Sequence, residues 1–132
     1  MFIKNGKKQR LDKTGRKRFR KCKTQLEHNF LEWACFLSQQ AAEKAIKAVY
    51  QKIGGEAWGH SIKELLKGIE EKIDIPQDLI EKAKYLDRFY IPTRYPNGWP
   101  SGIPADYITK EETVNAISYS EKIVQFCKSF LS

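Results

Sequence analysis

The sequence of 132 residues contains few of the side chains that build a metal or redox centre. It has two histidines, His28 and His60, and three cysteines at positions 22, 35 and 127 that lie far apart and form no C-x-x-C pair. Zinc sites use Cys and His ligands in closely spaced pairs, so we expect no metal and no cofactor. An odd number of separated cysteines is typical of reduced thiols in a cytoplasmic protein.

Long apolar runs and strand-like patterns are also missing from the sequence. No apolar run approaches the ~20 residues that a membrane-spanning helix needs. The basic N-terminus is not followed by the apolar segment of a secretory signal. We therefore expect no membrane association and a cytoplasmic location. No segment alternates apolar and polar residues over the length of a strand, which argues against a sheet protein.

Acidic residues are nearly absent from the first part of the chain. Residues 1–23 contain eleven Lys or Arg against Asp12 alone, a net charge of +10, whereas residues 24–132 carry a net charge of −2. Such an arm is able to attract polyanions in a salt-dependent manner. The alternative interpretation is a solvated arm without a dedicated partner. The length indicates one domain, divided into a flexible basic arm at 1–15 and a helical domain at 16–132.

The longest helical pattern covers residues 30–53 and follows a short helix expected from Arg16. Its apolar residues form two adjacent stripes, so we expect this helix to contact neighbours on both sides, as a central helix does. The first stripe consists of Phe30, Ala34, Leu37, Ala41, Ala45 and Ala48, and the second of Cys35, Ala42, Ile46, Val49 and Ile53. The remaining face, expected to be solvated or to meet a partner subunit or a ligand, holds Gln39, Gln40, Glu43, Lys44 and Lys47.

Two shorter helices are expected after the glycine pair at 54–55, which ends the long helix. A capping box at Ser61 and Glu64 starts a helix that runs to about Ile73. Asp74 suits the N-cap of the next helix, and Pro76 suits its first turn because the missing N–H costs nothing there.

Pro92 is expected to end that helix, and a second capping box, Thr109 with Glu112, opens the last one. The residues expected to face inward from the last helix are Val114, Ile117, Val124, Cys127 and Leu131. Together these patterns predict an all-α, up-and-down bundle of four to five helices, with a long Pro/aromatic-rich loop before the last helix.

That loop, residues 91–108, is longer than the connections that usually join the helices of a bundle. It follows or contains arginines that can pair with phosphates and rings on which a base can stack. On the alternative reading, the rings cover the end of the bundle and Arg88 forms a salt bridge to a neighbouring helix. The candidate nucleotide-binding residues are Gln40, Lys44, His60, Arg88, Tyr90, Arg94 and Tyr95.

The strings "SQQAAEKAIKAVY" (38–50), "GHSIKELL" (59–66) and "LDRFYIPTRYPNGWPSGIPADY" (86–107) resemble the HEPN family over roughly residues 26–132. The resemblance implies a small helical-bundle protein that forms homodimers and has a suggested nucleotide-binding role. It also implies that a neighbouring gene encodes a minimal nucleotidyltransferase. That enzyme would be the partner chain, in a toxin–antitoxin-like pair. The basic N-terminus departs from the family, whose members begin with a helix that mixes acidic and basic residues.

One branch of the family consists of ribonuclease toxins with an arginine four to six residues before a histidine. This chain lacks that motif, because the nearest arginine before either histidine is Arg20, too far from His28. We therefore expect no catalytic residues and a non-catalytic protein. Two alternatives stay open: a ribonuclease with an atypical site around Arg88, Arg94 and His60, and a nucleic-acid binder that acts through the basic arm.

Overall fold

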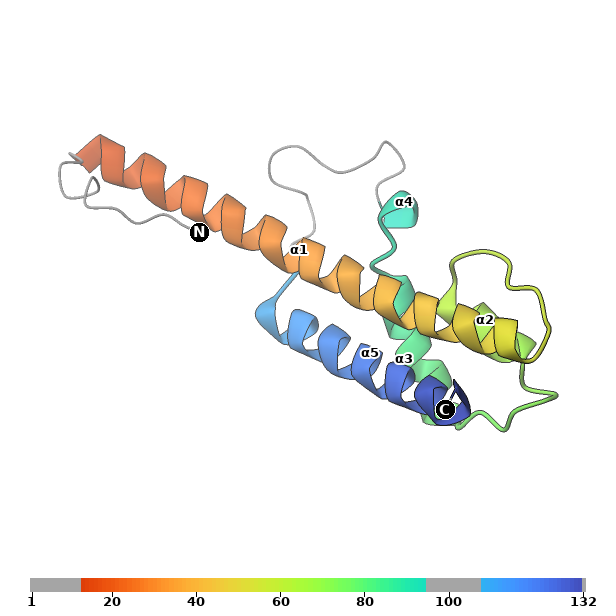
Figure 1. The fold of residues 1–132 in the computed structure, drawn as a ribbon. Helices are drawn as coiled ribbons and strands as arrows, with labels where there is room; N and C mark the ends of the chain where they lie inside the picture. The colour runs from red at the N-terminus through yellow and green to blue at the C-terminus, as the bar shows by residue number, and fades with distance from the viewer. Residues whose placement is uncertain (1–12, 95–107, 132) are drawn as a thin grey trace.

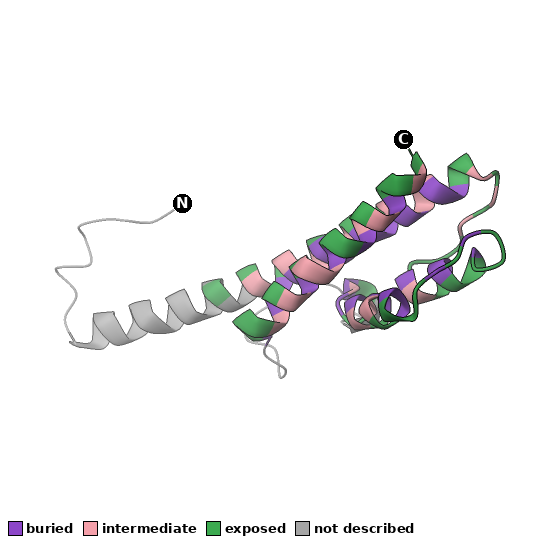
Figure 2. Ribbon diagram, turned by 90° about the horizontal axis from the view of Figure 1, so that it is seen from below, coloured by how far each residue is buried: buried purple, intermediate pink, exposed green. Residues whose placement is uncertain are grey.

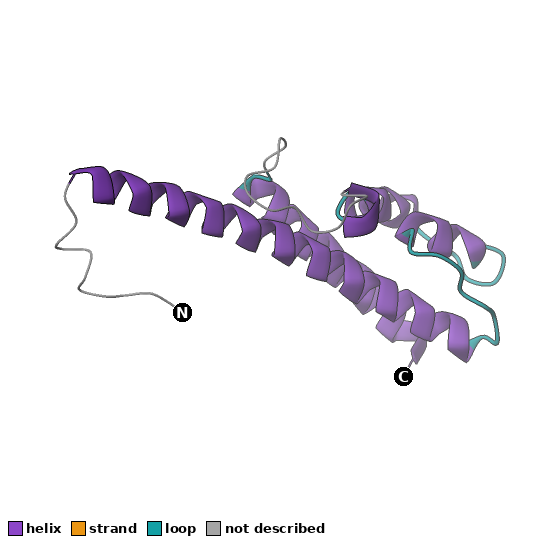
Figure 3. Ribbon diagram, turned by 90° about the horizontal axis from the view of Figure 1, so that it is seen from above, coloured by secondary structure: helices purple, strands orange, loops and turns teal. Residues whose placement is uncertain are grey.

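A computed structural model describes the backbone of residues 13–94 and 108–131; within these ranges, the side chains of residues 13–26, 28, 29, 93 and 94 are not described. The described residues contain helices and no strand (Figure 3). They form α1 (Lys13–Lys52), α2 (Ile62–Gly68), α3 (Gln77–Asp87), the single turn α4 (Ile91–Arg94) and α5 (Lys110–Leu131). The all-α bundle expected from the sequence is confirmed.

The helices α1 and α5 lie side by side and run in the same direction (Figure 1). Two contacts fix their register: the Cys35 thiol donates to Thr113 Oγ1 at 3.5 Å, and Ser120 Oγ donates to the carbonyl of Ser38 at 2.6 Å. Small side chains at such positions let helix backbones approach closely. Sequence periodicity indicated helices but did not give the relative direction of this pair.

The hydrophobic core lies where α1 meets α5 on one side and α2 with α3 on the other, and Figure 2 shows the buried residues on these facing sides. The largest side chains enclosed there belong to Phe89, Ile46, Ile62, Leu66 and Leu86. Burial of one such side chain stabilises the fold by about 1.5–3 kcal/mol relative to its exposure. The core therefore holds α2 against α1 and α3 against α5, although neither short helix is long enough to be stable alone.

Asp87, the last residue of α3, closes the N-terminus of α2. Its carboxylate accepts hydrogen bonds from Ser61 Oγ at 2.8 Å and from the backbone N–H groups of Ile62 and Lys63 at 2.7 and 3.3 Å. Helix N-termini carry unpaired N–H groups and partial positive charge, both of which a carboxylate satisfies. Burial raises the pKa of Asp87, while these hydrogen bonds act in the opposite direction.

Several expected helix boundaries are wrong. The short helix from Arg16 and the helix at 30–53 are one helix, α1, because no glycine or proline interrupts residues 16–53. Gly54, with φ of 78°, follows its end. The helix expected to reach about Ile73 ends at Gly68, and the residues after it form turns.

The boundaries around α3 also differ from expectation. Asp74 does not cap this helix; the N-cap is Pro76, which has no side chain able to cap. The helix ends at Asp87, before the proline, and Pro92 lies inside the turn α4. This is compatible with proline chemistry, since the first turn of a helix does not need the missing N–H.

The prediction of which α5 residues face inward is wrong for three of the five residues. The Thr109 and Glu112 capping box is confirmed by N–H bonds of 2.9 and 3.0 Å in the two directions. Val114, Ile117 and Leu131, however, are among the exposed large hydrophobic residues. The residues that face the core are Thr113, Ala116, Ser120, Ile123 and Cys127. Four of these five side chains are small or polar, which lets α1 pack closely against them; the exception is Ile123.

We expect Asp87→Ala to lower the free energy of unfolding by about 1–3 kcal/mol, because it leaves a hydroxyl and two N–H groups at the start of α2 without their acceptor. Urea unfolding followed by circular dichroism measures the change. The control is Asp74→Ala, which removes an exposed carboxylate that caps no helix and should leave the unfolding midpoint unchanged. Equal midpoints for both variants would contradict the role of Asp87.

Candidate functional site

A buried polar network begins on α1 with Gln39, which has no exposed surface. Its side-chain amide donates to Glu43 Oε1 at 3.1 Å and to the backbone carbonyl of His60 at 3.0 Å. Gln40 donates in turn to Gln39 Oε1 at 2.7 Å. The amide of Gln39 therefore uses both its donors and its acceptor, as a buried polar group must.

The carboxylate of Glu43, with 8% of the side chain exposed, is the centre of this network. Its Oε2 atom lies 3.0 Å from Lys47 Nζ and 2.9 Å from His60 Nδ1. Burial raises the pKa of Glu43, but hydrogen bonds from Lys47, His60 and Gln39 outweigh it and hold the pKa below its usual value. The carboxylate is therefore charged at neutral pH, and His60 Nδ1 must carry the proton that it donates.

The ring of His60 stacks on the ring of Tyr90, with centroids 4.5 Å apart and planes inclined by 18°. His60 precedes α2 and Tyr90 follows α3, and Asp87 ties these two elements together. Half of the His60 side chain is exposed. With Nδ1 bound to Glu43, the ring is held in one orientation while part of its surface remains open to a ligand.

The structure thus brings three of the expected site residues, Gln40, His60 and Tyr90, into one connected group. Lys44 is exposed one helical turn beyond Gln40. This arrangement can offer a ring face and an amide to a planar ligand, with an ammonium group nearby.

Arg88 is placed elsewhere. Its guanidinium lies 2.8 Å from the carboxylate of Glu112 on α5 and stands over the rings of Tyr85 and Phe89. These contacts match the salt-bridge alternative from the sequence. The side chain of Arg94, and Tyr95 as a whole, lie outside the described residues.

Sequence reasoning missed the importance of Gln39 and Glu43, which it placed on the face expected to be solvated or to meet a partner subunit or a ligand. Both are buried. The only signal was their position four residues apart among the small and apolar residues of the long helix, a spacing that puts them on one face. Because polar residues are mostly exposed in proteins, such a pattern ordinarily indicates a solvated face.

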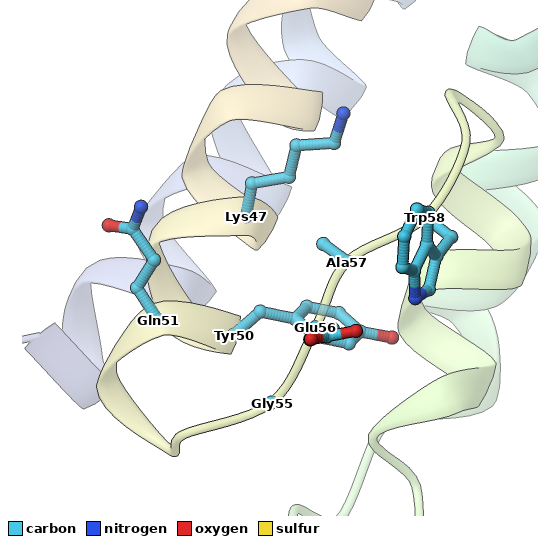
Figure 4. Close-up of a pocket in the computed structure, with 7 residues that line it drawn as sticks. All are labelled: Lys47, Tyr50, Gln51, Gly55, Glu56, Ala57 and Trp58. Carbon is cyan, nitrogen blue, oxygen red and sulfur yellow. The ribbon is translucent and has the colours of Figure 1, made fainter.

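A second feature on the same side of α1 is an open hollow of about 380 Å³ between the end of this helix and the loop that follows (Figure 4). Lys47, which pairs with Glu43, is shared between the hollow and the polar network. Trp58 on the loop is 78% exposed. The other residues that line the hollow are Tyr50, Gln51, Gly55, Glu56 and Ala57.

Large apolar side chains lie exposed on the outer face of α1 and on α5. On α1 they recur at steps of three and four, with Phe30 73%, Trp33 44% and Leu37 49% exposed. On α5 they include Val114 and Ile117, 63% and 42% exposed. We call this set the α1/α5 apolar face. Single exposed apolar residues are common in proteins, whereas a periodic set is typical of a contact with another chain.

Residues 13–94 and 108–131 contain neither a metal-binding cluster nor a membrane-spanning helix. In that part of the chain, no group of three or more His, Cys, Asp or Glu is placed to hold a metal ion. No helix there has the length and apolar character that crossing a membrane requires.

The chain matches the HEPN domain family over residues 9–130 and belongs to that family. Among solved structures it resembles TT1696 from Thermus thermophilus, at 48% identity and a TM-score of 0.64, with 75% of this chain and 78% of that chain covered. It resembles an HEPN domain protein, TM0613 from Thermotoga maritima, at 40% identity, TM-score 0.58 and coverage of 83% and 86%. An archaeal HEPN homologue, ST0689, matches at 36% identity, TM-score 0.62 and coverage of 87% and 85%. None of the curated proteins matches this chain.

Glu43→Gln should lower the free energy of unfolding at pH 7 by about 1–3 kcal/mol, because a neutral amide cannot replace the charged acceptor. The lowered pKa means that the charge stabilises the folded protein above the unfolded pKa of about 4.3. That stabilisation is lost as the pH falls through the folded pKa. The difference between wild type and variant should therefore shrink on acidification.

Urea unfolding between pH 7 and about pH 3 measures this dependence. Glu70→Gln, at an exposed carboxylate, is the matched control and should track the wild type at every pH. A difference between Glu43→Gln and wild type that stays constant over the whole range would show that the charge of Glu43 is not the stabilising feature.

Proposed function

We propose that this HEPN protein is a non-catalytic binding subunit that forms a homodimer and offers a nucleotide-binding surface to a separate minimal nucleotidyltransferase. The observation that carries the ligand part is the stacked pair of His60 and Tyr90 beside Gln40. Membership of the HEPN family suggests the partner enzyme. One form of this partnership is a toxin–antitoxin-like pair.

The ring pair supports nucleotide binding because its geometry is set in advance. Glu43 binds the ring nitrogen Nδ1 of His60, and Gln39 binds the backbone carbonyl of the same residue. A ligand base that stacks on this pair does not have to order the histidine ring, so less conformational entropy is lost on binding. Lys44, exposed one turn beyond Gln40, offers a cation for a phosphate group. Arg94 and Tyr95 remain candidates from the sequence.

The homodimer rests on the α1/α5 apolar face. The Cys35–Thr113 hydrogen bond puts Trp33 and Val114 at a similar level along the paired helices, so the two exposed sets are close together. Packing this face against a second copy would bury its large side chains, the main source of association free energy. An antiparallel arrangement is favoured because each copy carries a net charge of +10 in residues 1–23, and like charges repel.

The ribonuclease alternative has less support from the geometry. It requires Arg88 near His60, but the Arg88 guanidinium is bound to Glu112 on the far helix α5. The His60–Glu43 pair has the form of a general base with its orienting carboxylate. The atypical ribonuclease site therefore loses Arg88, one of its two expected arginines, so we keep the binding role as the proposal.

The ligand claim predicts that the purified protein binds a nucleoside triphosphate weakly and that Tyr90→Ala reduces the affinity by about 5- to 100-fold, since ring stacking contributes ~1–3 kcal/mol per base. Isothermal titration calorimetry with ATP, GTP, CTP and UTP measures it. Arg94→Ala should also weaken binding.

The matched control for the ring is Trp58→Ala, an exposed aromatic residue outside the stacked pair, which should leave the affinity unchanged. Absence of a heat of binding for all four nucleotides, both alone and with the nucleotidyltransferase, would remove the ligand part of the proposal and leave the dimer part standing.

The dimer claim predicts that Leu37→Glu or Ile117→Lys converts the protein to a monomer, because either change places a charge in the apolar contact. Sedimentation velocity measures the mass of the species. Trp58→Glu adds a charge at an exposed apolar residue away from the α1/α5 apolar face and should leave the dimer intact. A wild-type protein that sediments as a monomer at every concentration would end this part of the proposal.

A further inference from the structure

The N-terminal half of α1 projects past the start of α5 (Figure 1). The first residue of α5, Lys110, comes three residues before Thr113, which contacts Cys35 on α1. Residues 13–26 of α1 therefore lie beyond the paired part of the helix, in a segment about 20 Å long at 1.5 Å per residue. The backbone of this segment is helical.

The charge of this segment is concentrated on one side. Residues 13–23 include seven Lys or Arg and no acidic residue. At 100° per residue, six of the seven share one face, opposite the positions of Phe19, Cys22 and Leu26. We call these six residues the basic face of α1; they are Lys13, Arg16, Lys17, Arg20, Lys21 and Lys23.

The basic face is electrostatically unfavourable for an isolated helix. Like charges three and four residues apart destabilise a helix, and cations in the first turn oppose the positive end of its dipole. The first turn of α1 contains no acidic residue, and residues 24–132 have a net charge of only −2 with which to compensate. A bound polyanion would relieve this repulsion and stabilise the segment.

We propose that the basic face of α1 binds the phosphate backbone of nucleic acid without sequence specificity. Duplex nucleic acid presents about one negative charge per 1.7 Å along its axis, dense enough to pair with six cations in a segment about 20 Å long. An anionic membrane is the less suitable occupant, because the opposite face has only three apolar residues to insert into lipid. This inference is independent of the proposed nucleotide site and of the dimer.

The experiment uses the full chain and fluorescence anisotropy with random-sequence duplexes of about 20 base pairs, one of DNA and one of RNA, over a range of salt concentrations. The affinity should fall with a log–log salt slope of about −4 to −5, since each neutralised phosphate contributes about −0.9 for B-form DNA. Changing Arg16, Lys17, Arg20 and Lys21 together to Gln should reduce the slope by about 3 to 4 and the affinity at least 100-fold at low salt.

The matched control removes the same charge from the bundle by changing Lys67, Lys72, Lys84 and Lys122, all exposed, to Gln. This control should bind within about threefold of the wild type. A second variant keeps the charge while changing the side chains, Arg16→Lys with Arg20→Lys, and should retain binding because a backbone contact needs cations rather than a particular fork geometry.

Three outcomes would overturn the proposal. Equal losses for the basic-face variant and the bundle control would show that net charge, not this face, attracts nucleic acid. Full binding by the basic-face variant that is lost on deletion of residues 1–12 would assign the interaction to the preceding residues. Absence of binding to either duplex at low salt, with capture by phosphatidylserine vesicles, would assign the face to a membrane. Circular dichroism confirms that each variant is folded as the wild type is.

Discussion

The candidate site depends on one interaction, the pairing of the buried Glu43 carboxylate with His60 and Lys47. A charge taken out of water is destabilising unless hydrogen bonds compensate for its lost hydration. Here Gln39, Lys47 and His60 together supply this compensation. Because His60 lies in the loop between α1 and α2, the same contacts that stabilise the charge fix the start of α2. The half-exposed position of the His60 ring against Tyr90 is a consequence of that constraint.

A second constraint acts at the other side of α1, where small residues face α5. Small side chains such as Cys35, Ala116 and Ser120 at the contact allow close backbone approach, and several large apolar residues of both helices lie away from it. Some, such as Phe30 and Ile117, remain on the outer surface. The α1/α5 apolar face therefore lies on the same two helices whose small residues pair inside the chain. The basic character of the N-terminal segment comes from its Lys and Arg residues and depends on neither of these contacts.

The sequence predicted well those features that arise from local chemistry. The capping boxes at Ser61 and Thr109 form hydrogen bonds in the structure because a hydroxyl at the N-cap satisfies a nearby N–H of the same chain. It predicted poorly those that depend on helix packing. Val114 and Leu131 look like core residues by hydropathy, yet they are exposed, since hydropathy does not tell which stripe a neighbouring helix will contact. Gln39 and Glu43 look solvated for the same reason.

The sequence by itself determined the helical class, the family, the two capped helix starts and the separation of a strongly basic N-terminus from a nearly neutral body. Each of these follows from composition, from short motifs or from spacing along one helix. Only the tertiary structure decided that α1 and α5 run in the same direction, that Arg88 pairs with Glu112, and that His60 meets both Glu43 and Tyr90. The physical reason is that these contacts join residues far apart in sequence, and their geometry depends on how the whole core packs.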